Sequence, residues 1–300
     1  MWQKLHRDLA RANLSGQPWR GALYLADPDW PQRLGQLLQT WSSLEAAELL
    51  AAPVDRDDRD PGWAAQPIQL LLQRLETPWF PRVLAQDTLV PYFQPIVSLH
   101  RGEVCGYEAL IRANCDGHVV GAGSLIGAAR AHQSLRAFDQ AARSSIIRKA
   151  TPQIGRDRWL FINFTPSAVY DPATCLATTW RACQQAGADL SQIVFEVIEN
   201  ESFPDISLLE RILAAYRSQG ARVALDDLGA GYTSLSYLMA LKPDVVRLDR
   251  ELIQDLTRQD PRAQLVSSLL RFARECGIRT VAEGIETAEE LHLLRELGAD

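Results

Sequence analysis

The sequence predicts an α/β fold in which a ring of mostly parallel strands is covered by helices, with a small helical module in front of it. Strand-like and helix-like patterns alternate from about residue 90 onward, which is typical of parallel strands with covering helices. Six strand-like segments contain or end in acidic or amide side chains. Six of the eight tryptophans precede residue 80, which indicates a distinct N-terminal module.

Composition and charge narrow the class of protein. The chain has 300 residues, of which 47% are hydrophobic and 23% charged, as in ordinary globular proteins. A net charge of -6 argues against a nucleic-acid polymer as partner. The five cysteines form no C-x-x-C pair, which favours reduced thiols and a cytoplasmic location. No stretch resembles a signal peptide or a membrane span.

The N-terminal module, residues 1–84, contains two expected helices. The first covers residues 31–50, with Asp29 as a candidate cap, and the second covers residues 66–75. Between them, residues 53–62 are rich in charges and are expected to form a loop. This module shows no candidate chemistry, so we expect a packing or regulatory role.

The second region, residues 85–300, begins with an antiparallel hairpin of strands 92–97 and 104–111 around a short turn. Five strands then alternate with helices. The strands are expected at 159–164, 193–198, 222–226, 245–249 and 279–283, and the helices at 125–132, 135–150, 173–186, 206–218, after Thr233, 261–276 and 288–297. Seven strands are one short of a closed barrel of eight. Because Asp300 follows a helix end, we expect the last strand to be missing from this chain.

Oxygen-bearing side chains gather at the expected carboxyl ends of these strands, where barrel enzymes carry their reactive groups. They are Glu108, Asn163, Glu196, Asp226, Asp227 and Glu283. Several carboxylates in one site require raised pKa values or bound cations. Oxygen ligands without His or Cys favour Mg²⁺, Mn²⁺ or Ca²⁺. Adjacent aspartates suit a two-metal site for phosphodiester hydrolysis, and the glycine-rich segment 228–235 that follows them is expected to form a loop at this site.

Three motifs carry a family resemblance: Glu108-Ala-Leu110 with Arg112, Asp226-Asp-Leu-Gly-Ala-Gly-Tyr232, and Val281-Ala-Glu-Gly-Ile-Glu-Thr287. Together they resemble the EAL-domain family of cyclic di-GMP phosphodiesterases, over about residues 85–300. The resemblance implies a TIM-like barrel with an antiparallel first strand. It also implies hydrolysis of cyclic di-GMP to linear pGpG with two Mg²⁺ or Mn²⁺ ions, inhibition by Ca²⁺, and a homodimer.

The resemblance further implies roles for individual residues. The first ion would be held by Glu108, Asn163, Glu196 and Asp226, and the second by Asp226, Asp227 and Glu283. Glu199 would support the Asp-Asp loop, and Glu286 would order water or substrate near the ions. Substrate contacts would come from Gln94, Leu110, Arg112 and Asp249. Two of these have structural alternatives: Asp249 as a residue that holds Arg247 or a backbone amide, and Glu286 as a support for the last helix, capped by Thr287.

One departure from the family affects function. Arg247 stands where the family has its catalytic lysine. Arginine keeps the charge and can position water together with Asp227, but it does not readily release a proton. A catalytically weak or inactive receptor for cyclic di-GMP is therefore the main alternative. A glycoside hydrolase with two carboxylates is a third hypothesis, and the number of acids fits metals better.

Overall fold

The computed structural model describes residues 2–14, 16–19, 22–25, 28–52, 65–169, 171, 175–197, 206–229 and 235–300. The chain divides into two compact units, which are considered separately: Met1–Arg82 with Gly123–Leu135, and Val83–Ala122 with Arg136–Asp300. The expected charged loop at 53–62, Glu199 and most of the glycine-rich segment after Asp227 lie outside the described residues.

The first unit is mainly helical and has its own apolar core. Its elements are α1 (Trp2–Arg11), β1 (Gly16–Trp19), β2 (Ala22–Leu25), α2 (Trp30–Leu38), α3 (Ser43–Ala47), β3 (Leu50–Ala51), β4 (Gln66–Pro67), α4 (Ile68–Glu76) and most of α6 (Ala122–Ala131). Helix α5 (Phe80–Ala85) runs across the boundary between the units. The core side chains of this unit include Leu9, Leu34, Leu38, Trp41, Ile68 and Leu72. Their burial gives the unit a hydrophobic centre separate from that of the barrel.

The prediction of one continuous helix over residues 31–50 is wrong. Helix α2 ends at Leu38, and a new helix begins after Ser42. The Ser42 hydroxyl accepts a hydrogen bond from the Glu45 amide, and the Glu45 carboxylate accepts one from the Ser42 amide at 3.0 Å. With this capping box, Ser42 is the N-cap of a new helix, so the chain does not continue as one helix through this position. Asp29 occupies the N-cap position of α2 without a side-chain capping bond.

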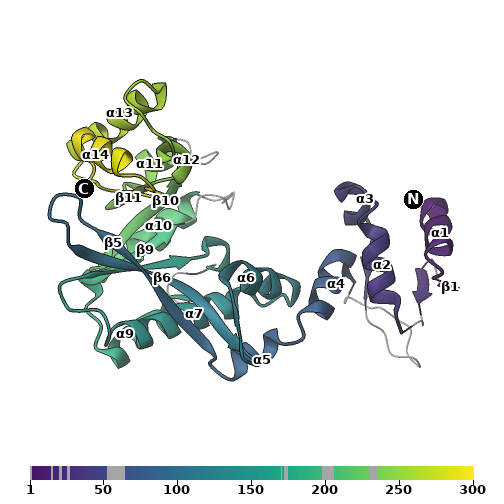
Figure 1. Ribbon diagram of the computed structural model, residues 1–300. Helices are drawn as coiled ribbons and strands as arrows, with labels where there is room; N and C mark the ends of the chain where they lie inside the picture. Colours follow the sequence, from purple (N-terminus) through teal and green to yellow (C-terminus); the bar gives the residue numbers. More distant parts are fainter. Residues whose placement is uncertain are drawn as a thin grey trace. The chain divides into compact units, whose positions relative to one another are not determined.

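The second unit is a curved mixed sheet of a TIM-like barrel, with helices on its outer face (Figure 1). The sheet order is β12-β11-β10-β9-β8-β6-β5, and β7 (His118–Val120) pairs with β6. The strands are β5 (Leu89–Val97), β6 (Val104–Cys115), β8 (Trp159–Phe164), β9 (Ile193–Val197), β10 (Arg222–Leu228), β11 (Val245–Leu248) and β12 (Arg279–Ala282). Strand β5 is antiparallel to β6, and β6 through β12 run parallel along the sheet order. The predicted antiparallel first strand is therefore confirmed.

Helices follow these strands as the alternation predicts. They are α7 (Leu135–Ala150), α9 (Ala177–Ala186), α10 (Ile206–Ser218), α11 (Leu235–Leu241), α12 (Arg250–Ile253), α13 (Pro261–Glu275) and α14 (Ala288–Leu297). Short 3-10 turns lie at Pro166–Ala168 and Leu190–Gln192. No helix in the described ranges is long and apolar enough to cross a membrane.

Alternation along the strands divides the apolar side chains into two layers. Leu160, Ile162 and Phe195 belong to the large core cluster, which also includes apolar residues of the covering helices. Phe161 and Val194, the neighbours of these residues in the chain, face the other way and pack with Ala224 and Val245 inside the barrel. Because side chains two residues apart share a face of a strand, the inner cluster determines which following residues point into the barrel.

The chain's last residue connects the two outer strands of the sheet. The backbone carbonyl of Asp300 accepts a hydrogen bond from the Leu99 amide at 2.8 Å, next to β5. Its side chain accepts another from the Thr280 amide of β12 at 2.9 Å. Asp300 thus holds both sides of the open sheet at the end of the barrel where β12 begins.

Candidate active site

The polar side chains of the site form a layer directly above the inner apolar cluster. On five parallel strands, the residue two positions after an inner apolar side chain is polar. The pairs are Phe161 and Asn163, Val194 and Glu196, Ala224 and Asp226, Val245 and Arg247, and Val281 and Glu283. The period of two therefore directs all five polar side chains toward the same mouth of the barrel, at the carboxyl ends of the strands.

Strand β6 contributes Glu108 by the same rule, two residues after Gly106. A Cβ atom on Gly106 would lie 3.0 Å from the carbonyl oxygen of Trp159 and 3.2 Å from the Phe161 ring, so the glycine permits close packing against β8. Glu108 is only 6% exposed. Its Oε1 accepts a hydrogen bond from Asn163 Nδ2 at 2.9 Å, which joins the first two predicted ligands.

The Asp226-Asp227 pair owes its geometry to an irregularity in β10. The register between β10 and β11 shifts between Leu225 and Leu228. Asp227 has a φ of 56°, in the left-handed region that non-glycine residues rarely adopt and that recurs at functional sites. Its amide donates to Asp226 Oδ1 at 3.1 Å. The bulge explains how two consecutive carboxylates can approach the same mouth, where a regular strand would point them in opposite directions.

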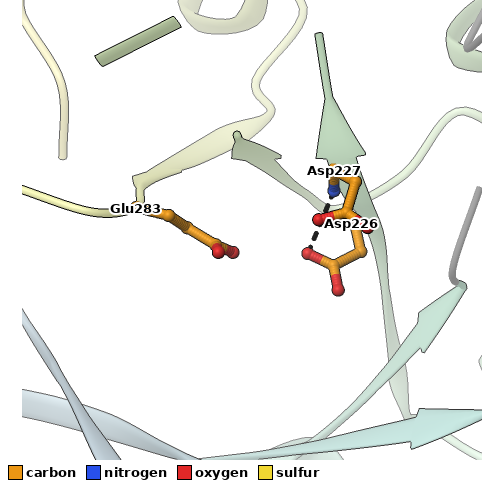
Figure 2. Close-up of side chains that lie close together, drawn as sticks. All are labelled: Asp226, Asp227 and Glu283. Atoms are coloured by element: carbon orange, nitrogen blue, oxygen red, sulfur yellow. Dashed lines mark hydrogen bonds between the residues drawn. The ribbon is translucent and has the colours of Figure 1, made fainter. Parts of the chain in front are cut away.

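Glu283 follows β12 and completes an acidic cluster with the aspartates. Each of Asp226, Asp227 and Glu283 offers a carboxylate oxygen, and the three oxygens lie within 4.8 Å of one another. Figure 2 shows the Glu283 side chain reaching from β12 toward the Asp226 carboxylate on β10. The turn after Glu283 is fixed by Gly284, whose φ of +67° favours glycine.

The chemistry of this donor set fits a divalent cation. All the donors are oxygens, the ligands that Mg²⁺, Mn²⁺ and Ca²⁺ prefer. Within the described part of the chain, two deeply buried acceptors, Asn163 Oδ1 and Glu196 Oε2, have no hydrogen-bond donor. Buried polar atoms of this kind call for a partner such as an ion or water.

Arg247 reaches into the same layer from β11 and contacts four carboxylates. Its two terminal nitrogens lie 2.7 Å from Glu108 Oε2 and 2.6 Å from Glu196 Oε1. Its Nε lies 3.2 Å from Asp226 Oδ1 and forms a close ion pair with Glu283. The arginine is 5% exposed, and Glu196 is fully buried. One positive charge thus stands among four acidic groups.

Burial and charge crowding raise the pKa values of these acids. Burial raises the pKa of Asp226 to about 6 and that of Glu283 to about 7, and the attraction of Arg247 offsets only part of the effect. Burial also raises the pKa of Glu196 well above its usual range. The pKa of Asp227 is raised, first by burial and then by repulsion from Asp249. Part of the excess negative charge is therefore neutralised by protons near neutral pH.

The predicted substrate contacts Gln94, Leu110 and Arg112 lie on the β5–β6 hairpin, whose second strand carries Glu108. Gln94 is exposed and sits opposite Glu108 in the β5–β6 register. Leu110 is half-buried opposite Tyr92. Arg112 donates to its neighbouring carbonyl, and its guanidinium carbon lies 5.8 Å from the Tyr92 ring centre. Their substrate roles stay predictions.

Asp249 and Glu286 make structural contacts beside the acidic cluster. Asp249 is the N-cap of α12 and accepts a hydrogen bond from the Glu251 amide at 2.6 Å. Glu286 forms an exposed ion pair with Arg250 at 2.6 Å. Thr287 caps α14 through a capping box, as the sequence indicates. The catalytic and substrate roles of Asp249 and Glu286 remain predictions, and Glu199 lies outside the described residues.

One buried polar group escaped the sequence analysis. Arg143 is 1% exposed on α7 and forms an ion pair with Asp139, one helical turn earlier. Asp139 Oδ1 also accepts a hydrogen bond from the Thr165 amide at 2.9 Å, just beyond the strand that carries Asn163. The signal was an acid and an arginine at i, i+4 spacing on an otherwise apolar helix face.

Comparison with known proteins agrees with this architecture. Residues 79–300 match the family model described as EAL domain. The chain is 28% identical over 222 residues to the cyclic di-GMP phosphodiesterase NbdA from Pseudomonas aeruginosa, which covers 72% of this chain and 28% of that protein. The chain spans about a third of the length of the first curated relatives it matches.

Two solved structures support the fold. A standalone versatile EAL protein from Vibrio cholerae O395 in a c-di-GMP bound form is 32% identical, with a TM-score of 0.64 over 71% of this chain and 87% of that chain. The Bacillus subtilis YkuI protein, in complex with c-di-GMP and calcium, is 23% identical, with a TM-score of 0.61 over 73% of this chain and 55% of that chain. The second likeness bears on the fold alone.

Proposed function

We propose that this chain, which belongs to the EAL domain family, hydrolyses cyclic di-GMP to linear pGpG with the help of divalent cations. Relatives named cyclic di-GMP phosphodiesterases support hydrolysis at the level of the family. The observation that carries the proposal is the convergence of oxygen donors from five strands on one barrel mouth, with buried acceptors that lack a donor among the described residues. That arrangement suits metal-assisted attack on a phosphodiester.

The proposed roles follow the donor positions. One cation would be held by Glu108, Asn163, Glu196 and Asp226, and a second by Asp226, Asp227 and Glu283. Bound Mg²⁺ or Mn²⁺ would lower the pKa of a water ligand and polarise the phosphoryl oxygen. Ca²⁺ is expected to bind and inhibit, since it accepts a looser and larger coordination shell.

The chain's own side chains would position the reacting groups. In hydrolysis a water oxygen bonds to phosphorus, the bond to the ribose 3′ oxygen breaks, and that oxygen takes up a proton. Asp227, which stands in the acidic cluster with Asp226 and Glu283, is proposed to position the attacking water and to receive its proton. Arg247 is proposed to position that water, and Glu286 to order water or substrate beside it.

Substrate binding is proposed to use the first hairpin and the neighbouring strand ends. Arg112 suits a phosphate because its guanidinium presents a fork of donors. Gln94, Leu110 and Asp249 are proposed to contact the rest of the dinucleotide. The glycoside hydrolase hypothesis loses support here, because more than two acids converge on one mouth.

A receptor that binds cyclic di-GMP without turnover is the second candidate. The observation that favours it is the position of Arg247, whose guanidinium contacts four of the proposed metal ligands. Arginine cannot act as a proton donor near neutral pH, because its pKa is far above that of lysine.

Chromatographic assay of cyclic di-GMP conversion in the presence of Mn²⁺ tests the proposal. We expect pGpG to accumulate, with activity abolished by a chelator and by Glu108→Ala. Glu103→Ala, which changes an exposed acid beside the hairpin turn, serves as the matched control and should retain activity. Tight binding of the dinucleotide without turnover would overturn hydrolysis in favour of the receptor, and restored turnover in Arg247→Lys would identify the blocked step.

The wider setting is also proposed. We propose that residues 1–84 regulate a phosphodiesterase domain formed by residues 85–300, supported by the separate apolar core of the first unit. A homodimer is proposed from the family resemblance. A cytoplasmic location is proposed from the five cysteines of the sequence, which form no C-x-x-C pair.

A further inference from the structure

The guanidinium of Arg247 lies where the ligands of the first proposed cation meet. Both carboxylate oxygens of Glu108 are already engaged: Oε1 by Asn163 at 2.9 Å and Oε2 by Arg247 at 2.7 Å. Glu196, which is fully buried, gives its Oε1 to Arg247 at 2.6 Å. Asp226 Oδ1 also lies 3.2 Å from Arg247 Nε, so three of the four residues proposed for this cation already contact the guanidinium.

The position of the arginine follows from the strand it occupies. Val245 lies in the inner apolar cluster, and Arg247 follows two residues later on the same face of β11. Only 5% of the residue is exposed, so its side chain is confined to the layer that the acids share. The planar guanidinium presents donors in several directions at once, which suits simultaneous contact with several carboxylates.

The second proposed cation position shares Asp226 and Glu283 with Arg247 and adds one carboxylate that forms no ion pair with Arg247 in the described part of the chain, Asp227. It stands with Asp226 and Glu283 in a cluster whose oxygens lie within 4.8 Å of one another. Even after Arg247 is counted, three more negative than positive charges remain among the four acids it contacts when all are ionised. One divalent cation would balance most of that excess.

We propose that Arg247 serves as a built-in cation in place of the first metal ion. The chain then binds one divalent ion, on the Asp226–Asp227–Glu283 side, and the guanidinium competes with a second ion for the remaining acids. This inference rests on the metal site of the proposed function and revises it, because the residues proposed there for the first cation would hold the guanidinium instead. A lysine at this position would carry its charge on a single nitrogen and would have one centre of donors, so it could not contact as many acids together. Arginine in place of the family's lysine thus changes the number of ions that the site holds, beyond any effect on proton transfer.

Binding of Mn²⁺ to the whole chain, without nucleotide, tests the proposal directly. Equilibrium titration should give one Mn²⁺ per chain, and electron paramagnetic resonance should give the spectrum of an isolated ion. In Arg247→Met, which removes the guanidinium and keeps an unbranched apolar side chain, a second ion should bind at least about tenfold more tightly. The two ions of the variant should be spin-coupled. Arg250→Met removes a nearby exposed arginine and should behave like the original chain.

Thermal unfolding provides a readout that is independent of counting ions. Removing the charge leaves the acids without their cation, so Arg247→Met should melt at a lower temperature than the original chain in chelator. Mn²⁺ should raise the melting temperature of this variant by more than it raises that of the original chain. If Arg247→Met does not fold in chelator, Arg247→Lys keeps the charge and should bind a second ion more tightly than the original chain does.

The possible outcomes separate this inference from the proposed function. Two spin-coupled Mn²⁺ ions in the original chain would overturn the role of Arg247 and leave hydrolysis intact, as would variants at Arg247 that bind no more metal. One Mn²⁺ ion in the original chain and two in Arg247→Lys, with no turnover by the original chain, would contradict hydrolysis and leave the role of Arg247 intact. Absence of Mn²⁺ binding in every variant would overturn both.

Discussion

Among the described residues of the second unit, two arginines are buried, and they differ in the number of acids around them. Arg143, 1% exposed on α7, pairs with the single carboxylate of Asp139, and its Nε donates to Thr179 Oγ1 at 3.3 Å. Arg247, 5% exposed on β11, contacts four carboxylates. The first is a balanced ion pair inside the wall of the barrel. The cluster around Arg247 has more acids than positive charges, so it can bind further cations.

The Arg143–Asp139 pair also contributes to the position of a strand that carries a residue of the Arg247 cluster. Asp139 accepts a hydrogen bond from the Thr165 amide, directly after β8. Strand β8 carries Asn163, which donates to Glu108 in the site. The balanced pair therefore holds the end of a strand that the unbalanced cluster uses. Charge balance, rather than burial, distinguishes a structural ion pair from a ligand-binding one.

The largest expected effect comes from breaking the balanced pair. Arg143→Met leaves the Asp139 carboxylate buried without its partner, so the free energy of unfolding should fall by about 3–5 kcal/mol. Urea denaturation of the whole chain measures it. Added Mn²⁺ should not restore the loss, in contrast to Arg247→Met. A loss below about 1 kcal/mol, or recovery with Mn²⁺, would contradict the distinction between the two arginines.

A matched pair of acid-to-amide changes sharpens the comparison. Asp139→Asn leaves Arg143 charged opposite a neutral amide and should lower the free energy of unfolding by about 2–4 kcal/mol. Glu196→Gln removes one acid from a cluster that has an excess of them, and burial already favours the protonated form of Glu196. This change should cost less than about 1 kcal/mol of stability while weakening Mn²⁺ binding. Equal destabilisation by the two changes would mean that the cluster has no excess charge.

A dependence of stability on pH is expected to be a smaller effect than the loss of either partner of the Arg143–Asp139 ion pair. Burial raises the pKa of Asp226 to about 6 from an ordinary value of 3.8. At a pH between these two values, the folded state keeps a proton on Asp226 that the unfolded state has lost. Stability from this group is present below the unfolded pKa and is lost as pH rises through the folded one. In metal-free buffer this group should make the free energy of unfolding fall by about 1 kcal/mol between pH 5 and pH 8.

Asp226→Asn is the control for this dependence. The amide does not titrate, so the fall in stability between pH 5 and pH 8 should be smaller in this variant. If the two curves have the same slope, protons held by the acidic cluster are not responsible.

Much of the fold could be predicted from the pattern of the sequence. The strand and helix alternation of residues 92–297 locates the strands of the sheet, because each is short, apolar and bounded by turns. In the first unit, the apolar spacing hid the break at Ser42, although the Ser42 and Glu45 spacing is that of a capping box. Helix α1 and the β1–β2 hairpin also went unpredicted. Short elements in a small module depend on packing more than on periodicity.

The site was predictable in its members and not in its contacts. Period-two patterning directs Asn163, Glu196 and Asp226 to one mouth, and the strand ends bring them together. The contact between Arg247 and Glu108, 139 residues apart, depends on how far an arginine reaches across the barrel. The bulge that turns Asp227 toward the cluster depends on the pairing of β10 with β11. Neither the Arg247–Glu108 contact nor the bulge can be predicted from the spacing of residues along the chain.

Anomalous diffraction at the manganese edge, from crystals grown with Mn²⁺ and cyclic di-GMP, tests the central claim most directly. We expect one manganese peak per chain, beside Asp226, Asp227 and Glu283. The guanidinium of Arg247 should remain within hydrogen-bond distance of Glu108 and Glu196. Two manganese peaks, with the Arg247 side chain turned away from those acids, would contradict the claim that an arginine takes the place of a metal ion.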